Sequence, residues 1–131
     1  MIDHVSIAVR DLAACGRFYE AVLAAIGYGK LVVRPTTIGF GKKYPEFWLN
    51  ERRAMTPADP DSGTHICLRA SSIEAVQAFH AAAMAGGGES DGPPGPRPEY
   101  SAGYYAAFVR DPEGNRIEAV TFVTSAPAGS A

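Results

Sequence analysis

The strongest constraint on how this chain can fold is an internal repeat with an offset of 61 residues. Sliding the sequence along itself by that distance aligns histidine, phenylalanine and glycine residues in step with the hydrophobic pattern. The aligned pairs include His4 with His65, Asp11 with Ser72, Phe18 with Phe79, Leu23 with Met84, and Gly27 with Gly88. We interpret the repeat as a tandem duplication, which predicts two copies of one structural module.

Both copies begin with a predicted strand that is followed by a helix. Apolar and polar residues mainly alternate in residues 2–9 and again in residues 65–69, as in a strand with one buried face. Apolar residues then recur every three to four positions, which is typical of an amphipathic helix. Asp11 and Ser72 are predicted to cap the two helices, because their side-chain oxygens can accept from free amides of the first turn.

Three shorter strands are predicted after each helix, so that the order β-α-β-β-β occurs twice. They lie near residues 29–34, 36–41 and 46–50 in the first copy, and near 89, 103–110 and 115–123 in the second. The segment from Asp91 to Pro98 holds four prolines and two glycines and is predicted to be a loop rather than a strand.

These elements predict an α+β fold built from two tandem βαβββ modules. The predicted domain spans residues 1–124, with module one at 1–55, module two at 63–124 and a flexible tail at 125–131. A chain of 131 residues is long enough for one such domain.

Composition and charge exclude several classes of partner. The formal charge of −2, without a run of Lys or Arg, argues against nucleic acid or an anionic membrane as partners. The longest apolar runs are about six residues, whereas a membrane span needs about 20. The N-terminus has no signal-peptide pattern, and two cysteines do not make a disulfide framework. We therefore expect a cytoplasmic protein with reduced cysteines.

Two histidines and one glutamate are the candidate metal ligands. His4 and His65 hold equivalent places in the first strands of the two copies. Beyond the proline-rich segment the offset becomes about 70, which makes Trp48 and Glu118 equivalent in the last strands. A lone histidine is usually structural, but the repeat and the apolar neighbours of Glu118 favour a shared site. Such a set suits divalent Fe, Mn, Ni or Zn and leaves coordination positions for water or substrate.

Five further residues are candidate substrate contacts. Strand alternation places Ser6 and Cys67 on the same face as the histidines, although the sequence favours Cys67 as a small buried residue over a reactive thiol. Arg69 could pair with an anionic substrate or reach solvent. Tyr104 could hydrogen-bond a reacting oxygen, and Trp48 would form an apolar wall. No residue is assigned as a general acid or base.

Several of these residues belong to motifs of a known superfamily. The chain begins with His4-Val-Ser-Ile-Ala-Val-Arg-Asp-Leu, continues with Phe18-Tyr19 and Thr64-His65-Ile66, and closes with Asp111-Pro-Glu-Gly-Asn-Arg-Ile-Glu118. In these motifs it resembles the vicinal oxygen chelate superfamily, also called the glyoxalase/bleomycin resistance/dioxygenase superfamily, over residues 1 to about 123. The resemblance implies that the tandem βαβββ modules form a cupped mixed sheet around a metal or ligand cavity, usually in a homodimer. It also implies that His4, His65 and Glu118 are the metal ligands.

The resemblance leaves the activity open between three enzyme types and a binding protein. The glyoxalase I branch has a fourth ligand, usually glutamate, where this chain has Trp48; Glu46, two residues earlier, is the alternative if the register differs. A three-ligand set resembles extradiol dioxygenases and fosfomycin-modifying thiol transferases. The chain is thus expected to be a metal-dependent lyase or isomerase, dioxygenase or thiol transferase that acts on a small oxygen-bearing substrate. The alternative is a metal-free protein that sequesters a small molecule or antibiotic.

Overall fold

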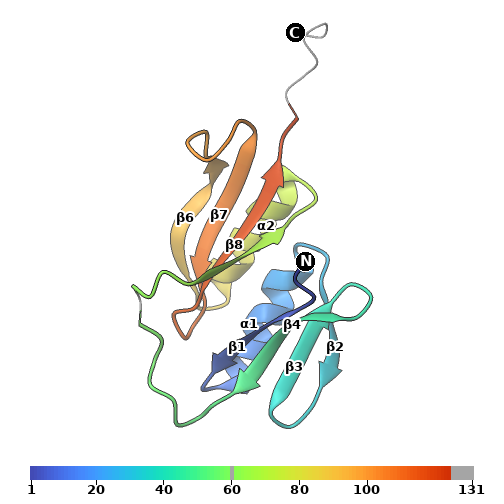
Figure 1. Cartoon of the computed structure of the whole chain (residues 1–131), viewed down its shortest axis with the longest axis vertical. Coiled ribbons are helices and arrows are strands. Elements are labelled where there is room, and N and C mark those ends of the chain that lie inside the picture. The colour runs from blue at the N-terminus through green and yellow to red at the C-terminus, as the bar shows by residue number, and fades with distance from the viewer. Residues whose placement is uncertain (60, 125–131) are drawn as a thin grey trace, which may run out of the picture.

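Two modules with the same order of elements follow one another in the computed structural model, which describes residues 1–59 and 61–124 (Figure 1). Module one contains β1 (Val5–Val9), α1 (Leu12–Ala24), β2 (Gly29–Val33), β3 (Thr37–Gly41) and β4 (Pro45–Glu51). Module two contains β5 (His65–Arg69), α2 (Ile73–Ala85), β6 (Glu89–Pro96), β7 (Tyr104–Arg110) and β8 (Arg116–Phe122). The predicted βαβββ duplication is confirmed. The tail predicted to be flexible, residues 125–131, lies outside the described residues.

The two helices begin where the sequence predicts. The Asp11 carboxylate accepts a hydrogen bond from the Ala14 amide at 3.0 Å, and the Ser72 hydroxyl accepts one from the Ala75 amide at 3.1 Å. Each contact satisfies an amide that has no partner inside the helix. Neither helix within the described ranges has the length and apolar character that a membrane span requires.

Each module forms its own four-stranded mixed sheet, with the orders β1-β4-β3-β2 and β5-β8-β7-β6. In each sheet the first and last strands of the module pair in parallel. Ser6 lies opposite Trp48, and Cys67 lies opposite Glu118. Because Ser6 and Cys67 are equivalent in the repeat, Trp48 holds the place in module one that Glu118 holds in module two. Glu46 is therefore the equivalent of Arg116.

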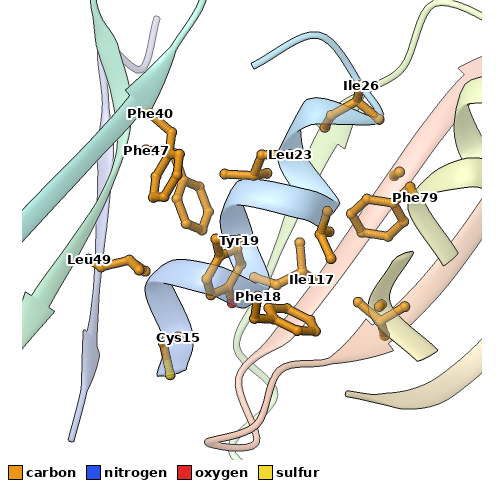
Figure 2. Packing of buried hydrophobic residues seen from close by; sticks show 14 of the residues in the cluster. Cys15, Phe18, Tyr19, Leu23, Ile26, Phe40, Phe47, Leu49, Phe79 and Ile117 are labelled. Carbon is orange, nitrogen blue, oxygen red and sulfur yellow. The ribbon is translucent and has the colours of Figure 1, made fainter. Parts of the chain in front are cut away.

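Helix α1 lies between the sheet of module one and module two, and it is buried on both sides. In Figure 2, Tyr19 and Leu23 lie toward the first sheet, whereas Phe18 lies on the opposite side of the helix. The Tyr19 ring is 5.1 Å from the Phe47 ring, measured between centroids. The second helix buries only Val76, Phe79 and Ala83. A single hydrophobic core therefore joins the two modules through α1.

Residues 91–96 form most of β6, so the prediction that this segment is a loop was wrong. β6 is the edge strand of its sheet and pairs with β7 through a register that shifts between Ser90 and Gly92 and again between Gly92 and Gly95. Proline has no backbone N–H to donate to a neighbouring strand, so it disrupts a central strand. An edge strand has one side unpaired and therefore tolerates it. The edge position and the two register shifts thus allow this proline- and glycine-rich segment to form a strand.

The turn between β7 and β8 fastens the second module to the first helix. The buried carboxylate of Asp111 accepts a hydrogen bond from the Tyr19 hydroxyl at 2.6 Å. Glu113 accepts from the Arg10 side chain at 2.9 Å and from the Asp11 amide at 3.0 Å. Burial alone would raise the pKa of Glu113, but these donors hold it below its ordinary value. The turn is thus a polar clamp that crosses the boundary between modules.

Candidate functional site

Polar side chains gather on the face of the second sheet that points away from the helices. On β8, Ile117 and Ala119 belong to the core, so the alternation of the strand directs Glu118 to the opposite face. The same alternation directs His65 and Cys67 of β5 to that face, next to Glu118 in the sheet. The fold therefore brings two of the three predicted metal ligands together.

Glu118 is the centre of this group. Its Oε1 lies 3.1 Å from Nε2 of His65, and its Oε2 accepts a hydrogen bond from the Tyr104 hydroxyl on β7. The Glu118 side chain is 3% exposed, whereas the His65 side chain is 50% exposed. A buried carboxylate is thus held on one side by a phenol and faces an imidazole that solvent can reach on the other.

The Tyr104 hydroxyl and the Cys67 thiol, which belong to the same group, both stay protonated at neutral pH. Burial raises the pKa of Tyr104 well above its ordinary value, and its hydrogen bond to Glu118 raises it further. Withdrawal of water raises the pKa of the Cys67 thiol to about 12, and the Glu118 carboxylate adds to this. Cys67 itself is exposed, against the interpretation of a buried small residue. Its thiol is therefore accessible but not a ready nucleophile.

His4 lies outside the Glu118 group. Its Nδ1 is 2.8 Å from a carboxylate oxygen of the adjacent Asp3, and its side chain is 54% exposed. His4 and His65 nevertheless line one cleft of about 400 Å³ between β1 and β5, together with Glu46 and Cys67. Among residues 1–59 and 61–124, no three His, Cys, Asp or Glu side chains are close enough to hold a metal ion.

The spacing of His65 and Glu118 fits a shared cation. Two bonds of about 2.1 Å at roughly a right angle place their donor atoms about 3 Å apart. The 3.1 Å between Nε2 and Oε1 matches this value, and it is also the length of a direct hydrogen bond between the imidazole and the carboxylate. The pair can therefore supply two ligands, and a third has to come from His4 or from another molecule.

The other predicted contacts divide between the two modules. Ser6 and Trp48 line an open hollow of about 390 Å³ on the first module, together with His4. The Arg34 guanidinium lies over the Trp48 ring, 5.6 Å from its centroid. Arg69, which follows His65 by four residues on β5, has its guanidinium over the Phe122 ring, 4.6 Å from the centroid. The described structure thus places Ser6 and Trp48 with His4, and Tyr104 and Cys67 with His65.

The sequence interpretation missed a second hollow beside His65. This cavity, of about 360 Å³, is lined by His65, Asp91, Arg97, Phe108 and Arg116, among others. Arg116 could have been found from the sequence, because it precedes Glu118 by two residues and so shares its face of the strand. Arg97 could not, because it lies within the proline-rich segment from Asp91 to Pro98 that was predicted to be a loop.

A family model and similar solved structures point to the same protein family. The model of the Glyoxalase/Bleomycin resistance protein/Dioxygenase superfamily matches residues 1–119. A glyoxalase/bleomycin resistance protein from Albidiferax ferrireducens T118 is 33% identical, with a TM-score of 0.79 over 90% of this chain and 96% of that one. A comparison with curated proteins found no match.

More distant structures share the fold. A family enzyme from Burkholderia phytofirmans PsJN has a TM-score of 0.71 at 19% identity, over 93% of this chain and 98% of that one. A fosfomycin resistance protein from Listeria monocytogenes has a TM-score of 0.68 at 16% identity, over 94% and 93% of the two chains.

Proposed function

Because the chain belongs to the glyoxalase/bleomycin resistance protein/dioxygenase superfamily, we propose that it is a metal-dependent enzyme that acts on a small oxygen-bearing molecule. The pairing of His65 with the buried Glu118 supports this proposal most directly. A buried carboxylate is costly unless donors or a cation compensate it. Here one oxygen has the Tyr104 hydroxyl, and the other faces the imidazole at a spacing suited to a shared ion.

The three ligands of the proposal are His65, Glu118 and His4. His4 lines the same cleft as His65, and its ring is half exposed and held by a surface contact with Asp3. Surface contacts of this kind are worth little, so the ring can turn at low cost. A divalent cation bound by these residues would polarise oxygens of the substrate.

The residues around the ligands have separate roles in this proposal. Tyr104 orients Glu118 by donating to its second oxygen, which leaves the first directed at His65. Cys67 supplies a protonated thiol on the same face. Trp48, with Ser6 beside it, would form an apolar wall next to His4. The reaction class within the superfamily is that of a lyase or isomerase, dioxygenase or thiol transferase.

Metal analysis of three histidine variants tests this proposal. The purified protein is loaded with Mn²⁺, Ni²⁺ or Zn²⁺, freed of excess ion and measured by elemental analysis. We expect one ion per site in the parent, and loss of bound metal in His65→Ala and His4→Ala. His80→Ala is the matched control, because His80 lies on α2 and contacts Ser90 at 2.8 Å.

The contrary outcomes are distinct. Equal metal in the parent and in His65→Ala would show that the bound ion lies elsewhere. No metal in any sample would leave the alternative, a binding protein that sequesters a small molecule without an ion.

We further propose that the protein is a homodimer, as the superfamily resemblance implies. Static light scattering at micromolar concentration is expected to give about twice the 13.8 kDa of one chain. A single species of one-chain mass would contradict this proposal. In that case the proposed metal site would need His4, His65 and Glu118 from the same chain, without a ligand from a second chain.

A further inference from the structure

We propose that the cavity beside His65 binds the anionic group of a small organic acid, so that the substrate of the proposed enzyme is an organic oxyanion. The cavity, of about 360 Å³, has walls from β5, β6, β7 and β8. This inference deepens the proposed function and depends on it only for the reaction at the metal end of the substrate.

Positive charge is in excess around this cavity. Arg97 and Arg116 line it, together with the carboxylate of Asp91. Asp91 lies 3.4 Å from a guanidinium nitrogen of Arg110 and 3.8 Å from one of Arg116. Two guanidinium groups, those of Arg110 and Arg116, therefore lie beside this carboxylate, and the guanidinium of Arg97 lines the same cavity. The Arg116 side chain is 32% exposed, so water screens its charge less than at the open surface.

Arg97 is held in a fixed orientation by the chain around it. Its guanidinium donates to the carbonyl of Pro93 at 2.7 Å and to that of Pro96 at 3.3 Å. It also lies over the Phe108 ring, 5.4 Å from the centroid. A guanidinium has more N–H donors than these two bonds use, and its planar fork suits carboxylate or phosphoryl oxygens. The side chain is thus oriented before a ligand binds, which lowers the entropy cost of binding.

Two glycines lie close to the guanidinium of Arg97. A Cβ at Gly92 would lie 3.2 Å from one guanidinium nitrogen of Arg97 and 3.0 Å from the Phe108 ring. A Cβ at Gly95 would lie 3.1 Å from the other nitrogen. The proline- and glycine-rich segment that was predicted to be a loop therefore packs closely around the Arg97 side chain. The prolines supply the carbonyls, and the glycines supply the space.

The cavity adjoins the proposed metal site. His65 lines the cavity and also faces Glu118. Arg116 pairs with His65 in the sheet and precedes Glu118 by two residues on the same face, a distance of roughly 7 Å along the strand. A molecule with an anionic group at one end and metal-binding oxygens at the other can span that distance. Phe108 and Tyr100 add aromatic walls, which favour an organic body between the ends.

Calorimetric titration of the metal-free protein tests the anion site. Metal is removed from the protein with EDTA, the EDTA is dialysed away, and the protein is titrated with benzoate, with phenylphosphonate and with neutral benzamide. We expect at least one anion to bind and benzamide not to bind. Arg97→Gln and Arg116→Gln should each weaken that binding about tenfold or more, since each removes a charge-assisted contact. The relative affinity of the two anions identifies carboxylate or phosphonate as the preferred group.

Arg53→Gln is the matched control. Its side chain is 82% exposed and pairs with Glu51 on the first module, so its loss should leave anion binding unchanged. Melting curves of all variants establish that they fold. No binding of either anion at about 10 mM, or equal affinity in the parent, Arg97→Gln and Arg116→Gln, would overturn the anion site. Because the titration excludes metal, that result leaves the metal proposal intact, and a failure of metal binding leaves the anion result intact.

Discussion

Replacing Asp111 with alanine is expected to lower the free energy of unfolding by about 3 kcal/mol or more. Asp111 is 3% exposed and accepts from the hydroxyl of Tyr19 at 2.6 Å. It also accepts from the amides of Glu113 and Asn115, at 2.8 and 2.9 Å, and from the Asn115 side chain at 2.9 Å. Alanine would leave the fully buried Tyr19 hydroxyl without this acceptor and would free the turn that holds α1.

Urea denaturation followed by the fluorescence of Trp48 measures this effect, because Trp48 is the single tryptophan. Trp48 lies on module one, so its signal also reports whether loss of a clamp in module two unfolds both modules together. Tyr19→Phe is the milder comparison, since it removes one donor and keeps the ring. Its expected cost is about 1 kcal/mol.

The double variant separates the contact from other effects of the two substitutions. With Asp111→Ala and Tyr19→Phe combined, the loss should be smaller than the sum of the single losses, because both variants remove the same hydrogen bond. A cost below about 1 kcal/mol for Asp111→Ala, or strict additivity, would mean that the turn does not clamp the modules.

Local patterns in the sequence were sufficient to predict the order of the elements and the faces of the strands, apart from the extent of β6. The repeat placed both helices at the same offset, and alternation placed Cys67 beside Glu118 on one face. Even the equivalence of Trp48 and Glu118 followed from a pattern, because pairing register preserves the alignment of the copies. These properties depend on neighbours within a strand or helix and on a repeated unit.

Contacts between modules could not be predicted in the same way. The repeat aligns His4 with His65, but it carries no information on the distance between their side chains. His4 contacts Asp3, whereas His65 contacts Glu118. The hydrogen bond between Tyr19 and Asp111 likewise joins residues from different copies, and no periodicity links them. The position of Arg97 depends on prolines and glycines whose irregular pairing the sequence pattern concealed.

Glu118→Gln is expected to weaken divalent metal binding by about 100-fold or more, because removal of a direct ligand exceeds the roughly 10- to 100-fold effect of removing an outer partner. The same variant should be at least as stable as the parent in EDTA. Glutamine is nearly the same size, can still accept from Tyr104 and can donate to the imidazole of His65. It also removes a buried charge, which favours the folded state when no cation is present.

Thermal melting with and without metal distinguishes a ligand from a purely structural residue. At about 100 times its Kd, a metal stabilises the parent by about 2.7 kcal/mol, which corresponds to a rise in Tm of several degrees. Glu118→Gln should show the melting temperature of the parent in EDTA and no rise with Mn²⁺ or Zn²⁺. Glu46→Gln is the informative control, because Glu46 lines the cleft with both histidines but holds the place equivalent to Arg116. An unchanged metal shift in Glu118→Gln would exclude Glu118 as a ligand, and its loss in Glu46→Gln alone would transfer that role to Glu46.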